Sequence, residues 1–525
     1  MGCSCSDNLP QENIETYNSL SDNTGKNAPL ISGPIDKNSS SNKPLKYKGS
    51  MGKINNQESD YNLFINKKSL VGNFVEKIET VYKFVKELGE GAFGKVYLVE
   101  HRTTAERFAC KRISKKKVKD REVLTQEINL MIDLDHPNIV KLFEVFEDKT
   151  YIFLIMEMLK GGELFDRILS RAKSNNYYTE KEIVRIYKQV VSGISFIHSN
   201  NVCHRDIKPE NIIFADEKEE SSIKIIDFGL SKIFDRKSNM TSQIGTCFYM
   251  SPEVIAGNYN EKCDVWALGV LLYILVCGRP PFAGANDKET MKKISKGKFE
   301  FKWEGWENIS TDCKDLITQI LDVNVDKRPS ADDILANKWI MLEAPKSTEI
   351  PININLDDLK KFGQTNKLGK AVSQFIAYRL SDSNIKDLNL MFQSIDSNGN
   401  GSISIEEFKT GVETFIKKNN IKIVVDELDN YFKAIDLDKN GVITYNEFIT
   451  ATFERKLNMT KEMVYQAFKT FDIDHDGGIS FAEFENVIQA KTEEDKIELK
   501  KLWDKIDKNK NGIIDFEELM ANLDI

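Results

Sequence analysis

The alternation of apolar and polar residues predicts a strand-rich segment followed by a helical one in the first two thirds of the chain. YKFVKELGEGAFGKVYLVEH, residues 82–101, alternates on both sides of a glycine cluster, as the two strands of a hairpin do. YIFLIMEML, residues 151–159, predicts a buried strand, whereas LTQEINLMIDL, residues 124–134, has the spacing of a helix. Residues 162–339 are expected to be mainly helical.

A single apolar stripe marks residues 356–380, after a linker from residue 344 that contains Pro and Asn. The stripe predicts one amphipathic helix, and a helix that only packs against the rest of the protein would show the same pattern. Its apolar positions are Leu368, Val372, Phe375, Ile376 and Leu380.

Four twelve-residue segments of one pattern follow, and their first residues are 40, 36 and 35 positions apart. Each has an oxygen-bearing side chain at positions 1, 3, 5 and 12, and glycine at position 6. Oxygen ligands suit Ca²⁺, and glycine permits the sharp turn, so we expect helix–loop–helix units in two pairs that bind up to four Ca²⁺ ions. With the backbone carbonyl at position 7, the expected ligands are Asp396, Asn398, Asn400, Ser402 and Glu407; Asp436, Asp438, Asn440, Val442 and Glu447; Asp472, Asp474, Asp476, Gly478 and Glu483; and Asp507, Asn509, Asn511, Ile513 and Glu518.

The four loops differ in charge. Positions 1, 3, 5, 9 and 12 hold two carboxylates in the first loop, three in the second, four in the third and three in the fourth. Because ligand charge tunes calcium affinity, the third loop is predicted to fill first and the first loop to be the weakest. The isoleucines at position 8 are expected to couple paired loops, and they are Ile403, Ile443, Ile479 and Ile514.

A glycine-rich pattern lies between the first two predicted strands, where the missing side chains let a backbone approach phosphates. It consists of Gly89, Gly91, Gly94 and Val96. Alone, it fits a plain tight hairpin equally well. Lys111 is placed to contact the α- and β-phosphates of ATP, and Glu127 can pair with it, although either residue alone would be a surface ion-pair partner.

The segment HRDIKPEN, residues 204–211, is more specific because it sets an aspartate and an asparagine five positions apart on one loop. Asp206 is expected to accept the proton of a substrate hydroxyl, and Lys208 to steady the transferred phosphate as a point charge. Asn211 and Asp227 are expected to hold Mg²⁺ that bridges the ATP phosphates. The pattern therefore predicts phosphoryl transfer from ATP.

With these motifs in this order, residues 82–340 resemble a serine/threonine protein kinase of the calcium/calmodulin-regulated group. The whole arrangement of kinase motifs, amphipathic junction and four loops resembles the calcium-dependent protein kinases. The resemblance implies an α+β bilobal protein kinase fold, with a small β-rich N-lobe and a mainly helical C-lobe, followed by an all-α domain of four EF-hands in two pairs at residues 386–525. It also implies that a junction helix within residues 344–385 blocks the catalytic cleft at rest and is withdrawn by calcium.

The same resemblance assigns further residues. Glu157 and Met158 are expected to form the hinge that faces adenine, behind a bulky Met156. Glu253, Asp264 and Arg328 are expected to hold the lower lobe together.

Substrate choice is expected to depend on charge. Glu163 and Glu210 resemble the acidic pair with which related kinases bind an arginine upstream of the target Ser or Thr, and such pairing favours basic substrates. Both residues could instead simply face solvent. Lys360 and Lys361 of the junction are candidates to mimic such a substrate.

The N-terminal 75 residues are expected to form a disordered tether, because they are rich in Asn, Ser, Lys and Asp and poor in aromatic residues. MGCSCS matches the myristoylation pattern at Gly2, and Cys3 or Cys5 can supply the second acyl chain that stable anchoring requires. An unmodified flexible tail is the alternative. Lipidation predicts a peripheral location on the cytoplasmic face of a membrane.

Composition narrows the class further. The chain has 525 residues, a length that suggests three or so units. Its hydrophobic content of 41% supports globular packing. Its net charge is −8, and residues 387–525 hold 28 acidic and 17 basic side chains, which argues against nucleic acid as a partner. Eight cysteines without paired metal-ligand spacing indicate a reducing compartment, and the cytosol fits best. The apolar stretch Val265–Gly278 is too short to span a membrane, so we expect a buried helix.

The leading hypothesis is a calcium-activated kinase that transfers the ATP γ-phosphate to protein Ser or Thr, acts as a monomer and needs no separate calmodulin. A catalytically silent calcium-responsive scaffold is one alternative, and the intact Lys111, Asp206, Asn211 and Asp227 speak against it. A calcium buffer is another alternative, but it would leave the kinase half unexplained.

Overall fold

The computed structural model describes residues 63–65, 71–74, 77–91, 94–118, 121–227, 246–257, 259–343, 356–380, 385–419, 426–453, 460–490 and 492–523. All of them belong to one compact unit, Asn62–Ile525. The predicted acylation signal at Gly2, Cys3 and Cys5 lies outside the described residues, as does most of the expected tether.

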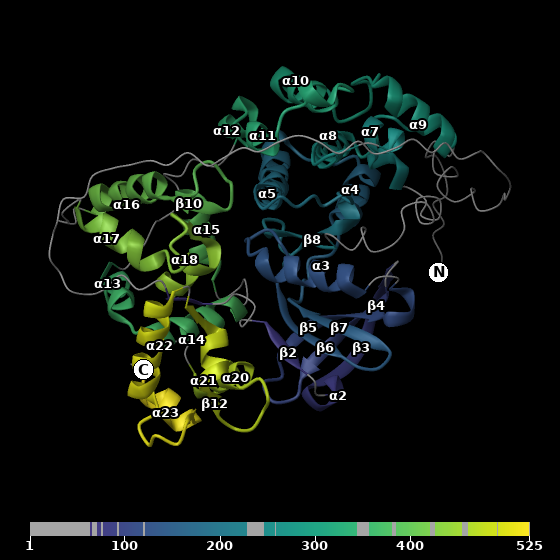
Figure 1. The fold of residues 1–525 in the computed structure, drawn as a ribbon. Coiled ribbons are helices and arrows are strands. Elements are labelled where there is room, and N and C mark those ends of the chain that lie inside the picture. Colours follow the sequence, from purple (N-terminus) through teal and green to yellow (C-terminus); the bar gives the residue numbers. More distant parts are fainter. Residues whose placement is uncertain are drawn as a thin grey trace, which may run out of the picture. The chain divides into compact units, whose positions relative to one another are not determined.

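A six-stranded sheet forms the small lobe, in the order β2-β6-β7-β5-β4-β3 (Figure 1). β3 and β4 are the predicted hairpin, and β7 covers most of the predicted buried strand. The strands are β2 (Gly72–Phe74), β3 (Tyr82–Gly91), β4 (Gly94–His101), β5 (Arg107–Ser114), β6 (Leu142–Glu147) and β7 (Tyr151–Met156), with the helices α2 (Ile78–Val81), η3 (Lys115–Lys117) and α3 (Arg121–Asp133). The buried core of the lobe contains Ile78, Tyr82, Val99, Cys110, Phe146, Phe153 and Ile155.

The larger lobe is mainly helical, as expected (Figure 1). Its longest helix, α5, begins with a capping box between Thr179 and Glu182 and buries one apolar face. The helices are α4 (Leu164–Lys173), α5 (Glu180–Ser199), η4 (Pro209–Asn211), η6 (Thr246–Tyr249), α7 (Pro252–Ala256), α8 (Lys262–Cys277), α9 (Asp287–Lys296), α10 (Thr311–Ile320), η7 (Val325–Lys327), α11 (Ala331–Leu335) and α12 (Lys338–Glu343), with the strand pair β8 (Ile212–Phe214) and β9 (Ile223–Ile225).

Helix α8 lies at the centre of this lobe, and its residues 263–277 are all buried. It is the helix expected at Val265–Gly278, and no helix among the described residues is long and apolar enough to cross a membrane. Close by, Arg328 is fully buried and pairs with Glu253 at 2.6 Å and 3.1 Å. This buried ion pair joins α7 to the segment after η7, as the resemblance implied.

The C-terminal residues form helix–loop–helix units whose loops pair through short strands. Ile403 pairs with Ile443, and Ile479 with Ile514, so the predicted coupling of the loops is confirmed. The elements are α15 (Lys386–Ile395), β10 (Ser402–Ser404), α16 (Ile405–Asn419), α17 (Asp426–Ile435), β11 (Val442–Thr444), α18 (Tyr445–Thr452), α20 (Lys461–Phe471), β12 (Ile479–Ser480), α21 (Phe481–Val487), β13 (Ile488–Ala490), α22 (Glu493–Ile506), β14 (Ile513–Ile514) and α23 (Phe516–Ala521).

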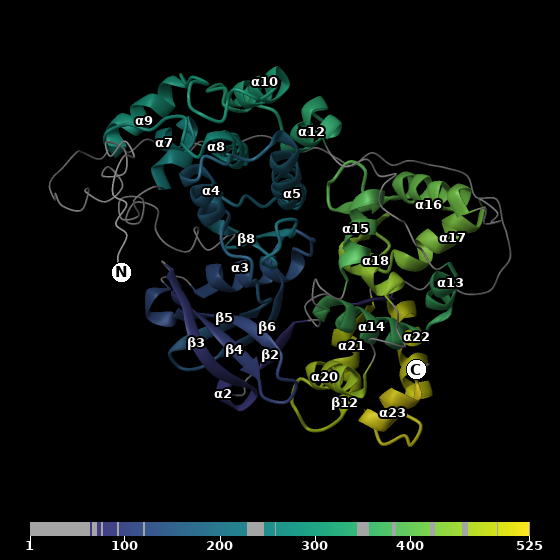
Figure 2. The same cartoon turned by 180° about the vertical axis from the view of Figure 1, so that it is seen from behind.

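The predicted single helix over residues 356–380 is wrong in one respect, because it is two helices, α13 (Leu356–Gln364) and α14 (Lys367–Arg379). The break lies at Asn366, whose side chain accepts a hydrogen bond from the Gly369 N–H at 2.7 Å and so caps a new helix. α13 packs against α17 and α18, and α14 against α18 and α20 (Figure 2).

The tether expected over residues 1–75 also needs correction at its C-terminal end. Strand β1 (Leu63–Ile65) pairs antiparallel with β13, and β2 pairs parallel with β6. The composition of residues 1–75 does not predict these strands, because each forms by pairing with the edge of an element that is distant in the sequence.

Candidate active site and calcium loops

The catalytic loop brings together the three residues that the sequence predicts to be catalytic. Lys208 Nζ lies 2.8 Å from Asp206 Oδ2, and Asn211 Nδ2 donates to the same oxygen at 2.9 Å and to the Asp206 carbonyl at 2.7 Å. Pro209 starts the short helix η4 that turns Asn211 back toward Asp206. The Asp206 carboxylate is therefore held in one orientation between two donors.

Backbone contacts to a buried carboxylate fix the start of this loop. Asp264, at the beginning of α8, accepts the His204 N–H at 2.7 Å, the Arg205 N–H at 2.6 Å and a hydrogen bond from His198 Nε2 at 3.0 Å. Burial by itself raises the pKa of Asp264, but these hydrogen bonds outweigh burial and lower the pKa below its usual value. Arg205 has a φ of +71°, a conformation that persists where the surroundings enforce it.

The predicted phosphate and magnesium ligands converge on the same cleft. Lys111 Nζ, on β5, contacts Asp227 Oδ1, and the lysine side chain is 4% exposed. The Ile226 N–H donates to the Asn211 carbonyl at 2.9 Å, so Asp227 and Asn211 lie on neighbouring segments. A buried cation beside two oxygen donors fits Mg²⁺ and a nucleotide phosphate. Glu127 lies on α3, but its side chain is outside the described residues, so its pairing with Lys111 stays a prediction.

The glycine-rich pattern is the turn of the β3–β4 hairpin, and its glycines serve different purposes. At Gly94 an added Cβ would lie 1.9 Å from the Arg112 carbonyl, so this glycine is required for the close approach of β4 to β5. Nothing lies within 4 Å of a Cβ at Gly89, which leaves room for a phosphate. Val96 is the partner of both Gly89 and Lys111 in the strand register.

The predicted hinge follows β7, and Met156 at its end is buried. The side chain of Glu157 accepts the Lys141 N–H at 2.8 Å and lies 3.2 Å from Lys224 Nζ, while its own N–H donates to the Lys141 carbonyl. Met158 is half-buried beside it.

The two predicted substrate-binding acids lie close to each other. Glu163 precedes α4 and Glu210 lies in η4. Burial, and then the charges of Asp166 and Glu210, raise the pKa of Glu163, and burial raises the pKa of Glu210. In the described part of the chain, Glu210 Oε2 is buried and has no hydrogen-bond partner. A half-buried acidic pair with an unused oxygen suits a cationic side chain.

The four loops share one geometry. The first aspartate of each accepts the N–H of the glycine at position 6, at 2.9–3.1 Å, and the last glutamate accepts the N–H at position 3, at 3.1–3.2 Å. Each of these glycines has a φ between 83° and 95°. Carboxylate oxygens of Asp436, Asp438 and Glu447 lie within 4.8 Å of one another, as do those of Asp472, Asp474 and Asp476. Such convergence of like charge fits a divalent cation.

The first loop packs against α5 and the segment after α3, and the second loop also reaches this segment, since its Asn446 N–H donates to Asp135 Oδ2 at 2.9 Å. Ser192 Oγ, on α5, donates to the Gly399 carbonyl at 2.6 Å, and a Cβ at Gly401 would lie 2.2 Å from the His136 ring. Burial raises the pKa of Asp396 to about 7 and lowers the pKa of His136 to about 3. No pattern in the sequence pointed to this contact.

The end of α14 also contacts the small lobe. Arg379 Nη1 lies 3.0 Å from Glu144 Oε1, on β6, in a pair that is almost fully buried. Tyr378 OH donates to the Leu142 carbonyl at 3.0 Å, and Lys141 Nζ donates to the Tyr378 carbonyl at 3.3 Å. Sequence reasoning missed these residues because the partners are more than 230 positions apart.

Comparison with known proteins agrees with this geometry. A model of the protein kinase domain matches residues 82–340, and a model of the EF-hand domain pair matches residues 385–453 and 461–523. Calcium-dependent protein kinase 3 of Plasmodium berghei is 36% identical over 477 residues, which is 89% of this chain and 84% of the relative. Calcium-dependent protein kinase 4 of Plasmodium berghei and of Plasmodium falciparum are each 39% identical, over 87% of this chain and 89% of each relative.

A bilobal kinase joined to EF-hand pairs defines a calcium-regulated phosphotransferase. The chain belongs to the calcium-dependent protein kinases. It is a calcium-activated serine/threonine protein kinase that uses ATP and Mg²⁺, its EF-hands bind Ca²⁺, and with its own EF-hands it needs no calmodulin.

The charge of the loops predicts an order of calcium binding. We expect Glu483→Gln to weaken overall calcium binding roughly tenfold or more and Glu407→Gln to weaken it less, because the third loop has four ligand carboxylates and the first has two. Isothermal titration calorimetry of the full chain measures both effects. Glu485→Gln, which changes an acid just outside the third loop, is the control. Equal losses for the two loop variants would contradict the ranking.

Proposed function

We propose that residues 344–385 hold the kinase inactive at rest, and that Ca²⁺ filling the chain's own EF-hands withdraws them. The observation that carries this proposal is the burial of α14. Residues 368–378 are buried without exception, among them Lys370 and Gln374, although only one face of the helix is apolar. Sensor EF-hands expose apolar grooves when they bind calcium, and an amphipathic helix is the usual occupant of such grooves. The conformation described above is then the released form.

The C-terminal end of α14 supports a second role for the regulatory region, which is to stabilise the ATP-binding hinge. Arg379 and Tyr378 contact residues 142–144 of β6, and the neighbouring Lys141 N–H binds the side chain of the hinge residue Glu157. Glu144 also accepts a hydrogen bond from Tyr82 OH at 2.7 Å, at the start of β3. In the released form, the calcium module therefore supports the small lobe next to the hinge.

For the chemical step, we assign the roles from the geometry of the loop. Bound Mg²⁺ and ATP supply the phosphoryl group and neutralise its charge. Asp206, oriented by Asn211 and Lys208, accepts the proton of the substrate hydroxyl, while Lys208 neutralises charge on the transferred group. Lys111 and Asp227, which contact each other in the cleft, would hold the nucleotide phosphates and the metal.

We infer further that the preferred substrates carry a basic residue before the target Ser or Thr. The buried, unpartnered Glu210 Oε2 beside Glu163 supports this preference, because an arginine would form charge-assisted hydrogen bonds there.

The N-terminal pattern supports a membrane-bound location. We propose that Gly2 is myristoylated, that Cys3 or Cys5 is palmitoylated, and that the kinase acts as a monomer on the cytoplasmic face of a membrane. One chain carries both the switch and the active site. Each of its four loops is proposed to hold one Ca²⁺ ion.

Removing the regulatory part tests the proposed block. In excess chelator, a chain that ends at residue 343 is expected to phosphorylate a basic Ser/Thr peptide much faster than the full chain does, but more slowly than the full chain in calcium, because it lacks the contacts of α14 with the small lobe. The full chain in chelator should be roughly a hundredfold slower than in calcium, as expected for a switch between about 1% and 99% of the active form. Asp206→Asn in the shortened chain is the background control. A shortened chain that is folded but inactive would mean that the C-terminal region activates and does not block.

A charge-neutral variant tests the substrate preference. Glu210→Gln is expected to lower kcat/KM about 10- to 100-fold for a peptide with an upstream arginine, since a charge-assisted hydrogen bond contributes ~1.5–3 kcal/mol. A matched peptide with alanine in place of arginine should lose little. Glu217→Gln, at an exposed acid nearby, is the control. An equal loss of kcat/KM for both peptides would show that Glu210 does not select the upstream arginine.

Acylation is tested with protein made together with an N-myristoyltransferase. We expect the wild type to sediment with membranes and Gly2→Ala to remain in the supernatant, because one or two acyl chains supply the membrane affinity. A Cys3→Ser, Cys5→Ser double variant should bind only weakly through the single remaining chain. Membrane binding that survives Gly2→Ala would exclude this anchor.

A further inference from the structure

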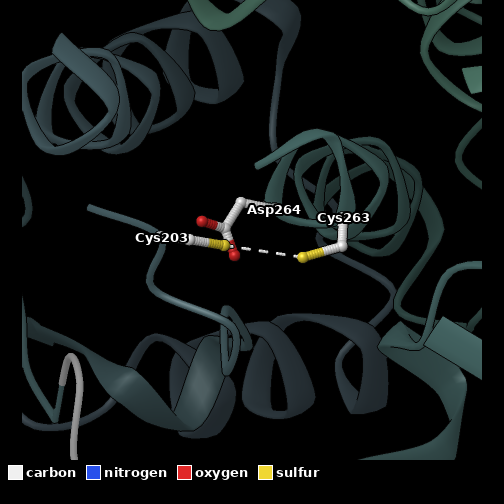
Figure 3. Close-up of side chains that lie close together, drawn as sticks. All are labelled: Cys203, Cys263 and Asp264. Carbon is white, nitrogen blue, oxygen red and sulfur yellow. Dashed lines mark hydrogen bonds between the residues drawn. The ribbon is translucent and has the colours of Figure 1, made fainter. Parts of the chain in front are cut away.

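Two thiols and a carboxylate lie close together at the start of the catalytic loop. Cys203 precedes His204 of this loop, and Cys263 and Asp264 lie in the first turn of α8 (Figure 3). The Sγ atoms of the two cysteines are 3.6 Å apart, and the donor atoms of all three side chains lie within 4.8 Å of one another. The residues come from two segments 60 positions apart in the chain.

The distance between the sulfurs distinguishes two uses of such a pair. A disulfide has an S–S bond of about 2.05 Å, so the thiols would have to approach by about 1.5 Å. Two thiolates on a tetrahedral zinc ion, each about 2.3 Å from the metal, are roughly 3.8 Å apart. The observed 3.6 Å, at which one thiol also hydrogen-bonds to the other, is close to the second value.

The remaining donors also suit a metal of this kind. Two sulfurs and one carboxylate oxygen are three protein ligands for Zn²⁺, which leaves one coordination position open. Hydrogen bonds from His198, and from the N–H groups of His204 and Arg205, already fix the orientation of the Asp264 carboxylate. Outer contacts of this type orient metal ligands and strengthen binding.

A cavity of about 530 Å³ lies beside the cluster and is lined by one of its three ligands, Cys203. Its lining includes Cys203, His198, Arg205, Asn260 and Lys262. Cys203 is half-buried, whereas Cys263 is 5% exposed, so an ion would enter from the side of Cys203. The open coordination position would then be filled by water from the cavity.

We propose that Cys203, Cys263 and Asp264 form a binding site for a soft divalent cation of the zinc type. The two thiols lose their protons to solvent when the ion binds, and no oxidant or reductant is needed. The site joins the start of the catalytic loop to the start of α8. Its sulfur ligands separate it chemically from the calcium loops and the magnesium site, which use oxygen ligands.

Cobalt(II) is the probe that tests this site. The reduced full chain, in saturating Ca²⁺ and Mg²⁺, is titrated with Co²⁺ and followed by absorption. We expect one Co²⁺ per chain to produce a thiolate-to-metal charge-transfer band, which the oxygen ligands of the other sites cannot give. Added Zn²⁺ should abolish the band by displacement. Absence of a thiolate band in the wild type, or a band that Zn²⁺ does not displace, would overturn the proposal.

Variants assign the band to these residues. Cys203→Ser and Cys263→Ser are each expected to weaken Co²⁺ binding at least about tenfold or to abolish the band. Cys313→Ser, which changes a buried thiol in α10, is the matched control and should leave the band unchanged. If Cys263→Ser does not fold, Cys203→Ser at the half-buried position decides the matter. If folded Cys203→Ser binds Co²⁺ with unaltered affinity, the metal binds elsewhere and the proposal is wrong.

Discussion

The regulatory part of this protein depends on the repulsion between carboxylates that its loops force together. In the second and third loops, three carboxylates approach within 4.8 Å of one another, and backbone N–H groups within each loop hold all three in place. Like charges at this distance destabilise one another unless a cation lies between them. The loops are therefore built around an ion, and the helices that flank each loop take their relative orientation from it.

Helix α14 connects this constraint to the kinase in the proposed switch. Its length is buried against α18 and α20, while its last residues contact β6 of the small lobe. The first loop reaches the other lobe through Ser192 and His136. A change in the angle between EF-hand helices would thus alter contacts on both sides of the hinge. None of these contacts involves the reacting atoms.

The catalytic loop, in contrast, is held by groups that calcium does not touch. Asp264 takes the backbone N–H groups of His204 and Arg205, and α8 around it is buried along its whole length. The β8–β9 pair and the Asn211 carbonyl fix the segment that carries Asp227. This rigidity favours regulation by access to the cleft and by support of the small lobe, with the chemical groups kept in one arrangement.

The sequence determined the features whose chemistry lies within one short segment. All the ligands of a calcium loop lie within twelve residues, and Asp206, Lys208 and Asn211 lie within six, so their spacing alone predicted both sites. The β3–β4 hairpin, the buried α8 and the isoleucine pairs followed from local pattern in the same way.

Only the tertiary structure decided the strands β1 and β2, the contact of Arg379 with Glu144, and the meeting of Cys203 with Cys263. The physical reason is distance along the chain. A strand edge, a thiol pair or a buried ion pair is formed with whichever group the folded chain brings near, and residue spacing in the sequence does not record that neighbour.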